Sequence, residues 1–227
     1  MRSATDVGAF LRLRRLIRKR GVSLVHTHSS VDSWLGSLAA KSLRRPVVRS
    51  RHVSIPIRHP LVYRLADRII TSGEAVRATV IGAGNAPEKI VTVSAGVDTE
   101  QFHPGVSGKS VRDELGLGGA PVIGLVANIR GSKGHNVFLD AARTVLAAAP
   151  DTRFLIVGDG VGFDEVKGRV QRMGLDSRVI LTGFRRDVPE GMAALDALVL
   201  PSTRSEATSQ VIPQALAVGT PVVGSDV

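Results

Sequence analysis

The stretch P-V-I-G-L-V-A-N-I-R-G-S-K-G-H, residues 121–135, decides the fold class. Its first half is a continuous run of apolar and small residues, which is typical of a strand buried on both faces of a parallel sheet. The turn that follows carries two glycines and two cations, and a long segment with helical periodicity begins at its end. A buried strand, a short turn and a helix in this order form the repeating unit of a doubly wound α/β domain.

The same alternation continues on both sides of this stretch. The sequence therefore predicts an α/β protein made of two Rossmann-like, doubly wound parallel-sheet domains. In the second half, strands are expected at 121–127, 153–157, 178–181, 197–200 and 221–224, and helices at 134–148, 163–173, 188–195 and 211–218. In the first half, helices are expected at 6–19, 31–43 and 74–81, and strands or apolar runs at 22–26, 46–50, 68–71 and 89–94.

A stretch rich in Gly, Pro and Ser, residues 96–110, separates the two halves and is typical of a linker. We predict a partial first domain over residues 1–105 and a second domain over residues 106–227. The first begins with a helix instead of a strand and a Gly-rich turn, and the second stops at its fifth strand. Both domains are therefore expected to be truncated.

Composition narrows the class of protein. The chain of 227 residues is 43% hydrophobic and only 4% aromatic, and it contains no cysteine, which excludes disulfides and cysteine-ligated zinc. A net charge of +10 favours an anionic partner. No apolar run reaches the ~18 residues that a membrane-spanning helix needs. The amino terminus does not resemble a signal peptide, so a cytoplasmic protein is expected.

Much of the positive charge lies in F-L-R-L-R-R-L-I-R-K-R, residues 10–20. Leu13, Leu16 and Ile17 recur at helical spacing and give this segment one apolar side. Two interpretations stay open. The one we favour is a helix packed on the core with a solvated basic face, and the other is a helix in peripheral contact with an anionic membrane, at its inner face.

The turn after the strand at 121–127 is a candidate anion site. Arg130 and Lys133 stand beside the start of the next helix, where cations oppose the helix dipole at a cost of roughly a few tenths of a kcal/mol each. An anion between them would remove that cost, and Gly131 and Gly134 would let the backbone approach it. The alternative is a pair of solvated surface cations. Since the turn lies at the carboxyl edge of a parallel strand, we favour phosphate binding.

A second candidate is S-E-A-T-S-Q-V-I-P-Q, residues 205–214. Glu206 precedes a short helix whose first N–H groups are free to bind an anion. In the alternative interpretation, Thr208 or Ser209 is only a helix cap. The G-D-G-V-G stretch at 158–162 fails the dinucleotide fingerprint, and we interpret it as a tight turn lining a cleft.

The histidines give a weaker signal. His26 and His28 point to the same side of a strand end, but no acidic residue nearby completes a metal site, and no D-x-D motif occurs. We therefore predict no metal. His52 follows a strand of the first domain, where a structural histidine and a functional one are both open interpretations.

Taken in order, these segments resemble the retaining, nucleotide-sugar-dependent glycosyltransferases of family 4, also called group 1, which have the GT-B fold. The resemblance covers nearly the whole chain, and the ordered set is specific although no single piece is. The matching stretches are V-H-T-H (25–28), P-V-V-R-S-R-H (46–52), G-V-D-T-E-Q-F-H-P (96–104), R-G-S-K-G-H (130–135), F-L-I-V-G-D-G (154–160), V-I-L-T-G-F (179–184), L-P-S-T-R-S-E (200–206) and A-L-A-V-G-T-P-V-V (215–223).

The resemblance implies transfer of a sugar from a nucleotide sugar to a glycan or lipid-linked acceptor, with retention and without a metal, in bacterial polysaccharide or lipopolysaccharide biosynthesis. The nucleotide sugar is the substrate, and no cofactor or nucleic acid is implied. By position, the resemblance implies that the donor diphosphate is held by Arg130, Lys133 and the N–H groups of Ser209 and Gln210. It implies that the catalytic residues are His52 and Glu206. It implies that the nucleoside contacts Gly183, Phe184 and Gln214.

Two positions depart from the family pattern. Gln214 stands where a second glutamate binds the ribose, and an amide offers one acceptor oxygen and no charge. Asn128 stands where the family often has its arginine, which leaves Arg130 as the candidate. Two other functions therefore stay open, an inactive nucleotide-sugar-binding module and a sugar-nucleotide epimerase on the same fold. A nucleic-acid-binding protein is disfavoured because aromatic stacking platforms are absent from the sequence.

Overall fold

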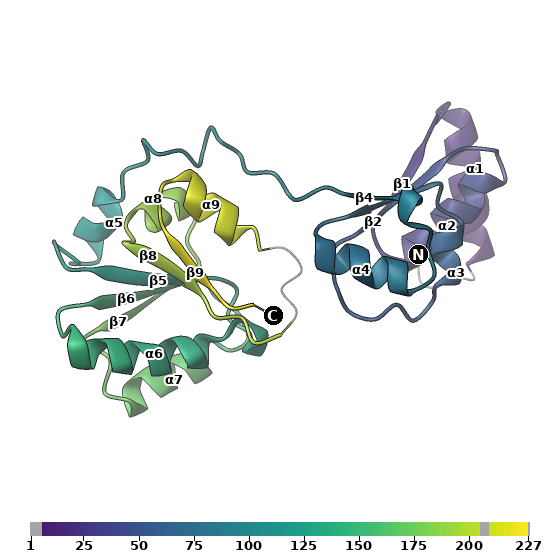
Figure 1. The fold of residues 1–227 in the computed structure, drawn as a ribbon. Helices are drawn as coiled ribbons and strands as arrows, with labels where there is room; N and C mark the ends of the chain where they lie inside the picture. Colours follow the sequence, from purple (N-terminus) through teal and green to yellow (C-terminus); the bar gives the residue numbers. More distant parts are fainter. Residues whose placement is uncertain (1–5, 205–208, 227) are drawn as a thin grey trace. The chain divides into compact units, whose positions relative to one another are not determined.

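A computed structural model describes residues 6–204 and 209–226 of the chain (Figure 1). The chain divides after Ala95 into two compact units, each an α/β unit built on one parallel sheet. The predicted fold class is therefore confirmed. The two units are described separately below.

The first unit contains a parallel sheet with the strand order β1-β2-β3-β4. A helix or a helical turn connects each strand to the next, as expected for parallel strands, which need crossover connections. Asp6 begins the first helix, since its Oδ1 accepts a 2.8 Å hydrogen bond from the N–H of Ala9. The strands are β1 (Val25–Thr27), β2 (Val47–Arg51), β3 (Arg68–Thr71) and β4 (Ile90–Thr92), and the helices are α1 (Val7–Lys19), α2 (Ser30–Lys41), α3 (Leu61–Arg64) and α4 (Glu74–Gly82).

The basic helix α1 uses less of its apolar side than the sequence suggests. Ile17 is 6% exposed, whereas Leu16 is 50% exposed. The helix therefore packs on the unit through a narrow stripe that includes Ala9 and Ile17. Among the residues the structure describes, no helix has the length and apolar character needed to cross a membrane.

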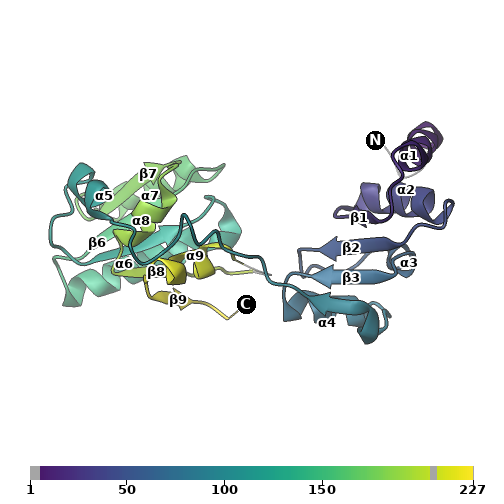
Figure 2. The ribbon, with the colours of Figure 1, turned by 90° about the horizontal axis from the view of Figure 1, so that it is seen from above.

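The second unit contains a five-stranded parallel sheet with the order β7-β6-β5-β8-β9. Helices α6 and α7 cover one face of it, and α8 and α9 cover the other (Figures 1 and 2). The strands are β5 (Val122–Val126), β6 (Arg153–Val157), β7 (Val179–Gly183), β8 (Ala197–Leu200) and β9 (Val222–Gly224). The helices are α5 (Lys109–Glu114), α6 (His135–Ala148), α7 (Phe163–Arg172), α8 (Val188–Ala193) and α9 (Val211–Ala217).

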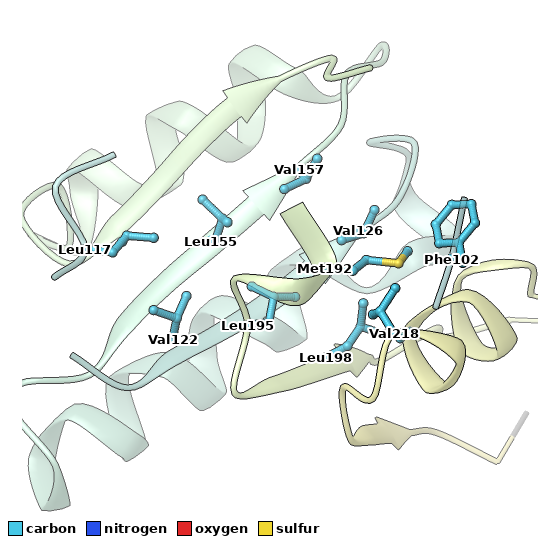
Figure 3. Packing of buried hydrophobic residues seen from close by; sticks show 11 residues of the cluster. Phe102, Leu117, Val122, Val126, Leu155, Val157, Met192, Leu195, Leu198 and Val218 are labelled. Atoms are coloured by element: carbon cyan, nitrogen blue, oxygen red, sulfur yellow. The ribbon is translucent and has the colours of Figure 1, made fainter. Parts of the chain in front are cut away.

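Two hydrophobic cores lie on the two faces of this sheet. Successive residues of β6 alternate between them, because side chains of a strand point to opposite faces: Leu155 belongs to one core, and Phe154 and Ile156 belong to the other. Figure 3 shows the first core, where Met192 and Val218, from α8 and the end of α9, meet the strands. Both faces of the sheet are buried, which explains the continuous apolar runs in the sequence.

The predicted linker, residues 96–110, is irregular in its first part but does not hang free. Phe102 is 7% exposed and packs in the first core of the second unit together with Val97 and Val106. A Cβ on Gly108 would lie 2.3 Å from the backbone N of Ala194, so this segment also lies close against the chain near α8. The contacts thus begin the second unit at Gly96, whereas the predicted domains meet at 105/106.

Candidate functional site at the carboxyl edge of the second sheet

The strand order of the second unit reverses between β5 and β8, which are neighbours in the sheet although three helices and two strands separate them in sequence. In open α/β sheets, ligands bind at the carboxyl ends of the strands at such a reversal. The loop after β5 begins at Ala127, and the loop after β8 begins at Pro201. These two loops form the centre of the candidate site.

Backbone contacts join the two loops. The N–H of Thr203 donates a 3.0 Å hydrogen bond to the carbonyl of Ser132. Gly134 has a φ of +73°, and a Cβ added there would lie only 1.7 Å from the carbonyl oxygen of Pro201. No residue with a side chain fits at this position without moving the backbone, so Gly134 is required for the close approach.

The loop after β6 packs against the loop after β5 in the same manner. Gly158 and Gly160 have φ values of +143° and +154°, and their added Cβ atoms would lie 1.9 Å and 2.5 Å from the carbonyl oxygens of Ala127 and Ile129. The N–H of Ile129 in turn donates a 2.9 Å hydrogen bond to the carbonyl of Asp159. The G-D-G-V-G stretch is thus a turn held close to a neighbouring backbone.

A cavity of about 670 Å³ lies beside this turn, lined by Asn128, the residues 158–161 and Phe184. Phe184 is 73% exposed, which is unusual for a large aromatic side chain. Gly183, which ends β7, has a φ of +71°, and its carbonyl accepts a 2.9 Å hydrogen bond from the N–H of Gly158. Gly183 and Phe184, two of the three positions predicted to contact the nucleoside, therefore lie at or next to this cavity.

The two predicted phosphate-binding cations flank one short turn, the 3-10 helix Gly131–Lys133. Arg130 precedes it and is exposed, and Lys133 ends it and is half-buried. Helix α6 begins two residues after Lys133, with Gly134 as its N-cap. The structure thus places both cations beside the amino end of α6, as the sequence predicts.

His135 is a residue of this site that sequence reasoning missed. It is the first residue of α6 and only 4% exposed. Burial, and secondly the positive charge of Lys133, lower the pKa of His135 to about 4. Within residues 6–204 and 209–226, its Nε2 atom has no hydrogen-bond partner. A neutral imidazole therefore lies next to Lys133, and the only sequence signal for it was its place directly after the Lys-Gly pair.

Three further predicted residues lie in α9 or directly before it. Ser209 is 7% exposed, and its Oγ has no hydrogen-bond partner among the described residues. Gln210 is exposed and is the N-cap of α9, and Gln214 is half-buried within that helix. Pro213 lies in the first turn, as expected. Glu206, the predicted catalytic acid, lies outside the residues that the structure describes.

In the first unit, three histidines from two neighbouring strands come together. Nδ1 of His28 lies 3.2 Å from Nε2 of His52, and the two rings are parallel with centroids 5.5 Å apart. The His26 ring centroid lies 4.2 Å from that of His28, and its Nε2 lies 2.8 Å from Oγ of Ser50. Burial, and then the charges of His28 and His52, lower the pKa of His26.

This arrangement links His52, the second predicted catalytic residue, to a pair that the sequence only placed on one strand end. The N···N contact of His28 and His52 has the length of a hydrogen bond, so one ring donates and the other accepts. Across the described residues, no three His, Cys, Asp or Glu side chains have an arrangement suited to a metal ion. The histidine cluster is therefore a hydrogen-bonded polar group at the carboxyl edge of the first sheet.

Two family models match the chain and together cover most of it. "Glycosyltransferase Family 4" matches residues 2–101, and "Glycosyl transferases group 1" matches residues 120–227. The chain belongs to the family 4, group 1 glycosyltransferases.

Curated members of this family align along nearly the whole chain. A UDP-Gal:α-D-GlcNAc-diphosphoundecaprenol α-1,3-galactosyltransferase of Escherichia coli is 28% identical over 98% of this chain. A 2-deoxystreptamine glucosyltransferase of Streptomyces kanamyceticus is 30% identical over 92% of this chain. The chain spans 62% and 60% of the length of these two glycosyltransferases.

Solved structures of glycosyltransferases share the GT-B fold with this chain. The Anabaena HepE protein in complex with UDP superimposes with a TM-score of 0.84 at 25% identity, over 95% of this chain and 62% of HepE. A glycosyltransferase from Rickettsia africae reaches a TM-score of 0.90 at 19% identity, over 100% of this chain and 65% of that protein. The two α/β units, each built on one parallel sheet, therefore have the GT-B fold class.

Proposed function

We propose that the protein containing this chain transfers a sugar from a nucleotide-sugar donor, with retention of the anomeric configuration and without a metal ion. The proposal rests mainly on the loop cluster, by which we mean the loops after β5 and β8. There Arg130 and Lys133 lie beside the start of α6, at the point where the strand order of the sheet reverses. The relatives are glycosyltransferases, and HepE has been crystallised with UDP and with UDP-glucose.

The proposed transfer reaction requires a site that stabilises negative charge. As the bond between sugar and diphosphate breaks, charge builds up on the departing nucleoside diphosphate. Arg130, Lys133 and the backbone N–H groups of Ser209 and Gln210 are proposed to receive that charge. Cations and N–H donors fixed before the reaction need no reorganisation, which is why such sites lower the barrier.

The remaining predicted residues complete the donor site in this proposal. Gly183 and Phe184 border the base beside the cavity at Asn128, and Gln214 contacts the ribose. Glu206 binds hydroxyls of the transferred sugar, and His52 faces that sugar from the first unit. The hydrogen bond between His28 and His52 would fix the orientation of the His52 ring.

The acceptor is proposed to be a glycan or a lipid-linked sugar. The Escherichia coli relative acts on a diphosphoundecaprenol-linked sugar, and a Rhizobium meliloti relative is a lipopolysaccharide core mannosyltransferase. A cytoplasmic protein that contacts the inner face of the membrane through the basic helix α1 would fit such an acceptor.

Replacement of Lys133 tests the donor site. We expect Lys133→Ala in the full-length protein to lose most of its affinity for UDP, measured by isothermal titration calorimetry. Lys167→Ala is the matched control, because Lys167 is an exposed lysine on α7, away from the loop cluster. Unchanged UDP binding by Lys133→Ala would remove the central claim.

One observation favours a second candidate, a nucleotide-sugar-binding module without transfer activity. Gln214 is half-buried on α9 at the position where the family has a ribose-binding glutamate. We expect Gln214→Glu to tighten UDP binding a few-fold, because a carboxylate accepts hydrogen bonds from both ribose hydroxyls. Weaker binding would contradict the role given to this position. Donor binding with neither transfer nor hydrolysis by the full-length protein would favour the second candidate.

A further inference from the structure

The first unit contains a second cavity, of about 340 Å³, between β2, α2 and α3. Trp34 and Tyr63 form part of its wall, and the segment 55–59 closes it on one side. Its volume lies within the range of about 300–1,000 Å³ that small-molecule sites occupy. Arg49 and Arg51 reach it from the face of β2 opposite to Ser50, because alternate residues of a strand point to opposite faces. The cavity is thus distinct from the histidine cluster, which includes Ser50.

Arg49 is the residue of this cavity that most strongly indicates a ligand, because it is buried and has hydrogen-bond donors that are unpaired among the described residues. Its side chain is only 5% exposed, and its guanidinium carbon lies 4.0 Å from the centre of the Tyr63 ring. Its Nε and Nη1 atoms are buried, and neither has a hydrogen-bond partner in the described part of the chain. Buried cations in proteins are normally paired with an anion and fully hydrogen-bonded. Stacking on Tyr63 satisfies neither of these two donors.

The other charged residues that line the cavity, Arg51 and Arg58, are positively charged like Arg49. Arg51 donates a 2.7 Å hydrogen bond from Nη1 to Oη of Tyr63 and a further one from Nη2 to the carbonyl of Ile55, while its buried Nε has no partner among the described residues. Arg58 also lines the cavity, whereas none of the described lining residues is Asp or Glu. Three guanidinium groups therefore face one small cavity without a compensating carboxylate.

We propose that this cavity binds a phosphate monoester carried by a small polyol or sugar, with Arg49 as its buried anchor. A phosphate monoester brings up to two negative charges and three acceptor oxygens, which suits three guanidiniums with unused donors better than a single carboxylate does. Trp34, Ile57 and Val62 also line the cavity and offer apolar surface to the carbon skeleton. Naming this ligand as an anionic acceptor rests on the proposed function; the anion site itself does not.

The test is calorimetric titration of glucose 1-phosphate into the full-length protein while UDP saturates the donor site. We expect binding that Arg49→Met weakens at least tenfold and Arg58→Met weakens a few-fold. Arg64→Met is the matched control, because Arg64 is an exposed arginine of α3 outside the cavity wall. Glucuronate supplies the same ring with a carboxylate, inorganic phosphate lacks the ring, and phosphatidylglycerol vesicles present a lipid phosphate.

Binding of glucose 1-phosphate that is strong in the wild type and in Arg64→Met but lost in Arg49→Met supports the proposal. Equal binding by wild type and Arg49→Met, or equal affinity for glucuronate, or binding to the vesicles alone, overturns it. If Arg49→Met does not fold, Arg58→Met decides, since Arg58 is exposed. Lys133→Ala, titrated separately with UDP and with glucose 1-phosphate, distinguishes this site from the proposed function, because it should lose UDP binding and keep glucose 1-phosphate binding.

Discussion

The two sheets of this protein begin in the same way and end differently. In the first unit, Asp67 precedes β3 and binds both backbone groups of Val47 on the neighbouring strand: its Oδ2 accepts from the Val47 N–H at 2.7 Å and its N–H donates to the Val47 carbonyl at 2.9 Å. In the second unit, Asp196 precedes β8 and does the same with Val122, at 2.7 Å and 2.8 Å.

In each unit a basic side chain also binds the aspartate. We call each of these groups a clamp: Asp67 with Val47 and Lys41, and Asp196 with Val122 and Arg112. Lys41 contacts Asp67 at 2.7 Å, and Arg112 contacts Asp196 at 2.8 Å. At this edge both units use one device to fix where neighbouring parallel strands begin. We assign both clamps a structural role only, because they lie at the amino ends of the strands, opposite the carboxyl ends where ligands bind.

At the carboxyl edges the resemblance ends. In the second unit, glycines lie so close to backbone carbonyl groups, as Gly134 does to Pro201, that no Cβ would fit between them. Backbone contacts therefore position the loops of this unit. The first unit presents side chains there, with His28 and His52 in contact. A backbone-built site suits a constant group such as a diphosphate, whereas a side-chain-built surface can change with the other substrate. Four predictions test this contrast.

The largest effect is expected for Gly134→Ala. The new methyl group would overlap the Pro201 carbonyl and hold a positive φ, so we expect a loss of roughly 3 kcal/mol or more in stability, together with loss of UDP binding. Thermal denaturation and calorimetry measure the two. Gly119→Ala is the matched control, because Gly119 precedes β5, outside the candidate site, and its Cβ would meet no atom within 4 Å. Equal behaviour of both variants would show that the loops are not positioned by backbone contact.

An intermediate effect is expected from acid, through His135. Its pKa in the folded protein is about 4, below the ordinary value of 6.5, so between these pH values the unfolded chain binds a proton that the folded chain does not. Stability should fall as the pH drops from 6.5 to 4, by at most about 3.5 kcal/mol at roughly 1.4 kcal/mol per pH unit.

His135→Gln should remove this part of the acid sensitivity in urea denaturation at pH 7 and pH 4.5. The control His103→Gln replaces an exposed histidine of the same unit and should leave the difference intact. If His135→Gln keeps the full pH dependence, the imidazole is not the group that carries it.

The smallest effects are expected at the two clamps. Asp67→Asn and Asp196→Asn each keep the shape but lose the charge that binds the strand N–H and the cation, so each should cost about 1 kcal/mol in urea denaturation. Asp151→Asn, at an exposed position, is the control. A loss in one unit only would show that the two clamps are not equivalent.

Acid should also weaken the first clamp. The hydrogen bond from Lys41, and then that from Val47, lower the pKa of Asp67 in the folded protein. The contribution of this carboxylate is therefore complete at neutral pH and lost as the pH falls through that lowered pKa.

Local patterns predicted most of the fold. The strands at 68–71, 153–157 and 197–200 have the predicted bounds, because buried parallel strands leave an apolar run between turn residues. The short helices Leu61–Arg64 and Lys109–Glu114 were missed, since neither is long enough to show a helical period. Arg130 and Lys133 were placed correctly beside the start of α6 because their turn is local in sequence.

What the sequence did not predict depends on contacts between distant segments. The contact of His28 with His52 joins two strands, and the burial of Arg49 arises from β2, α2 and α3 together. An arginine in a strand pattern is ordinarily assigned to the surface, so nothing in the pattern marks Arg49 as buried.

Phe102 has a consequence for how such proteins can be recombined. Although it lies in the segment between the two family matches, its ring belongs to the core formed by Val126, Met192 and Val218. An exchange of the first half between relatives should therefore splice the genes before Gly96. A chimera joined after residue 105 would give the second half a foreign ring in its own interior.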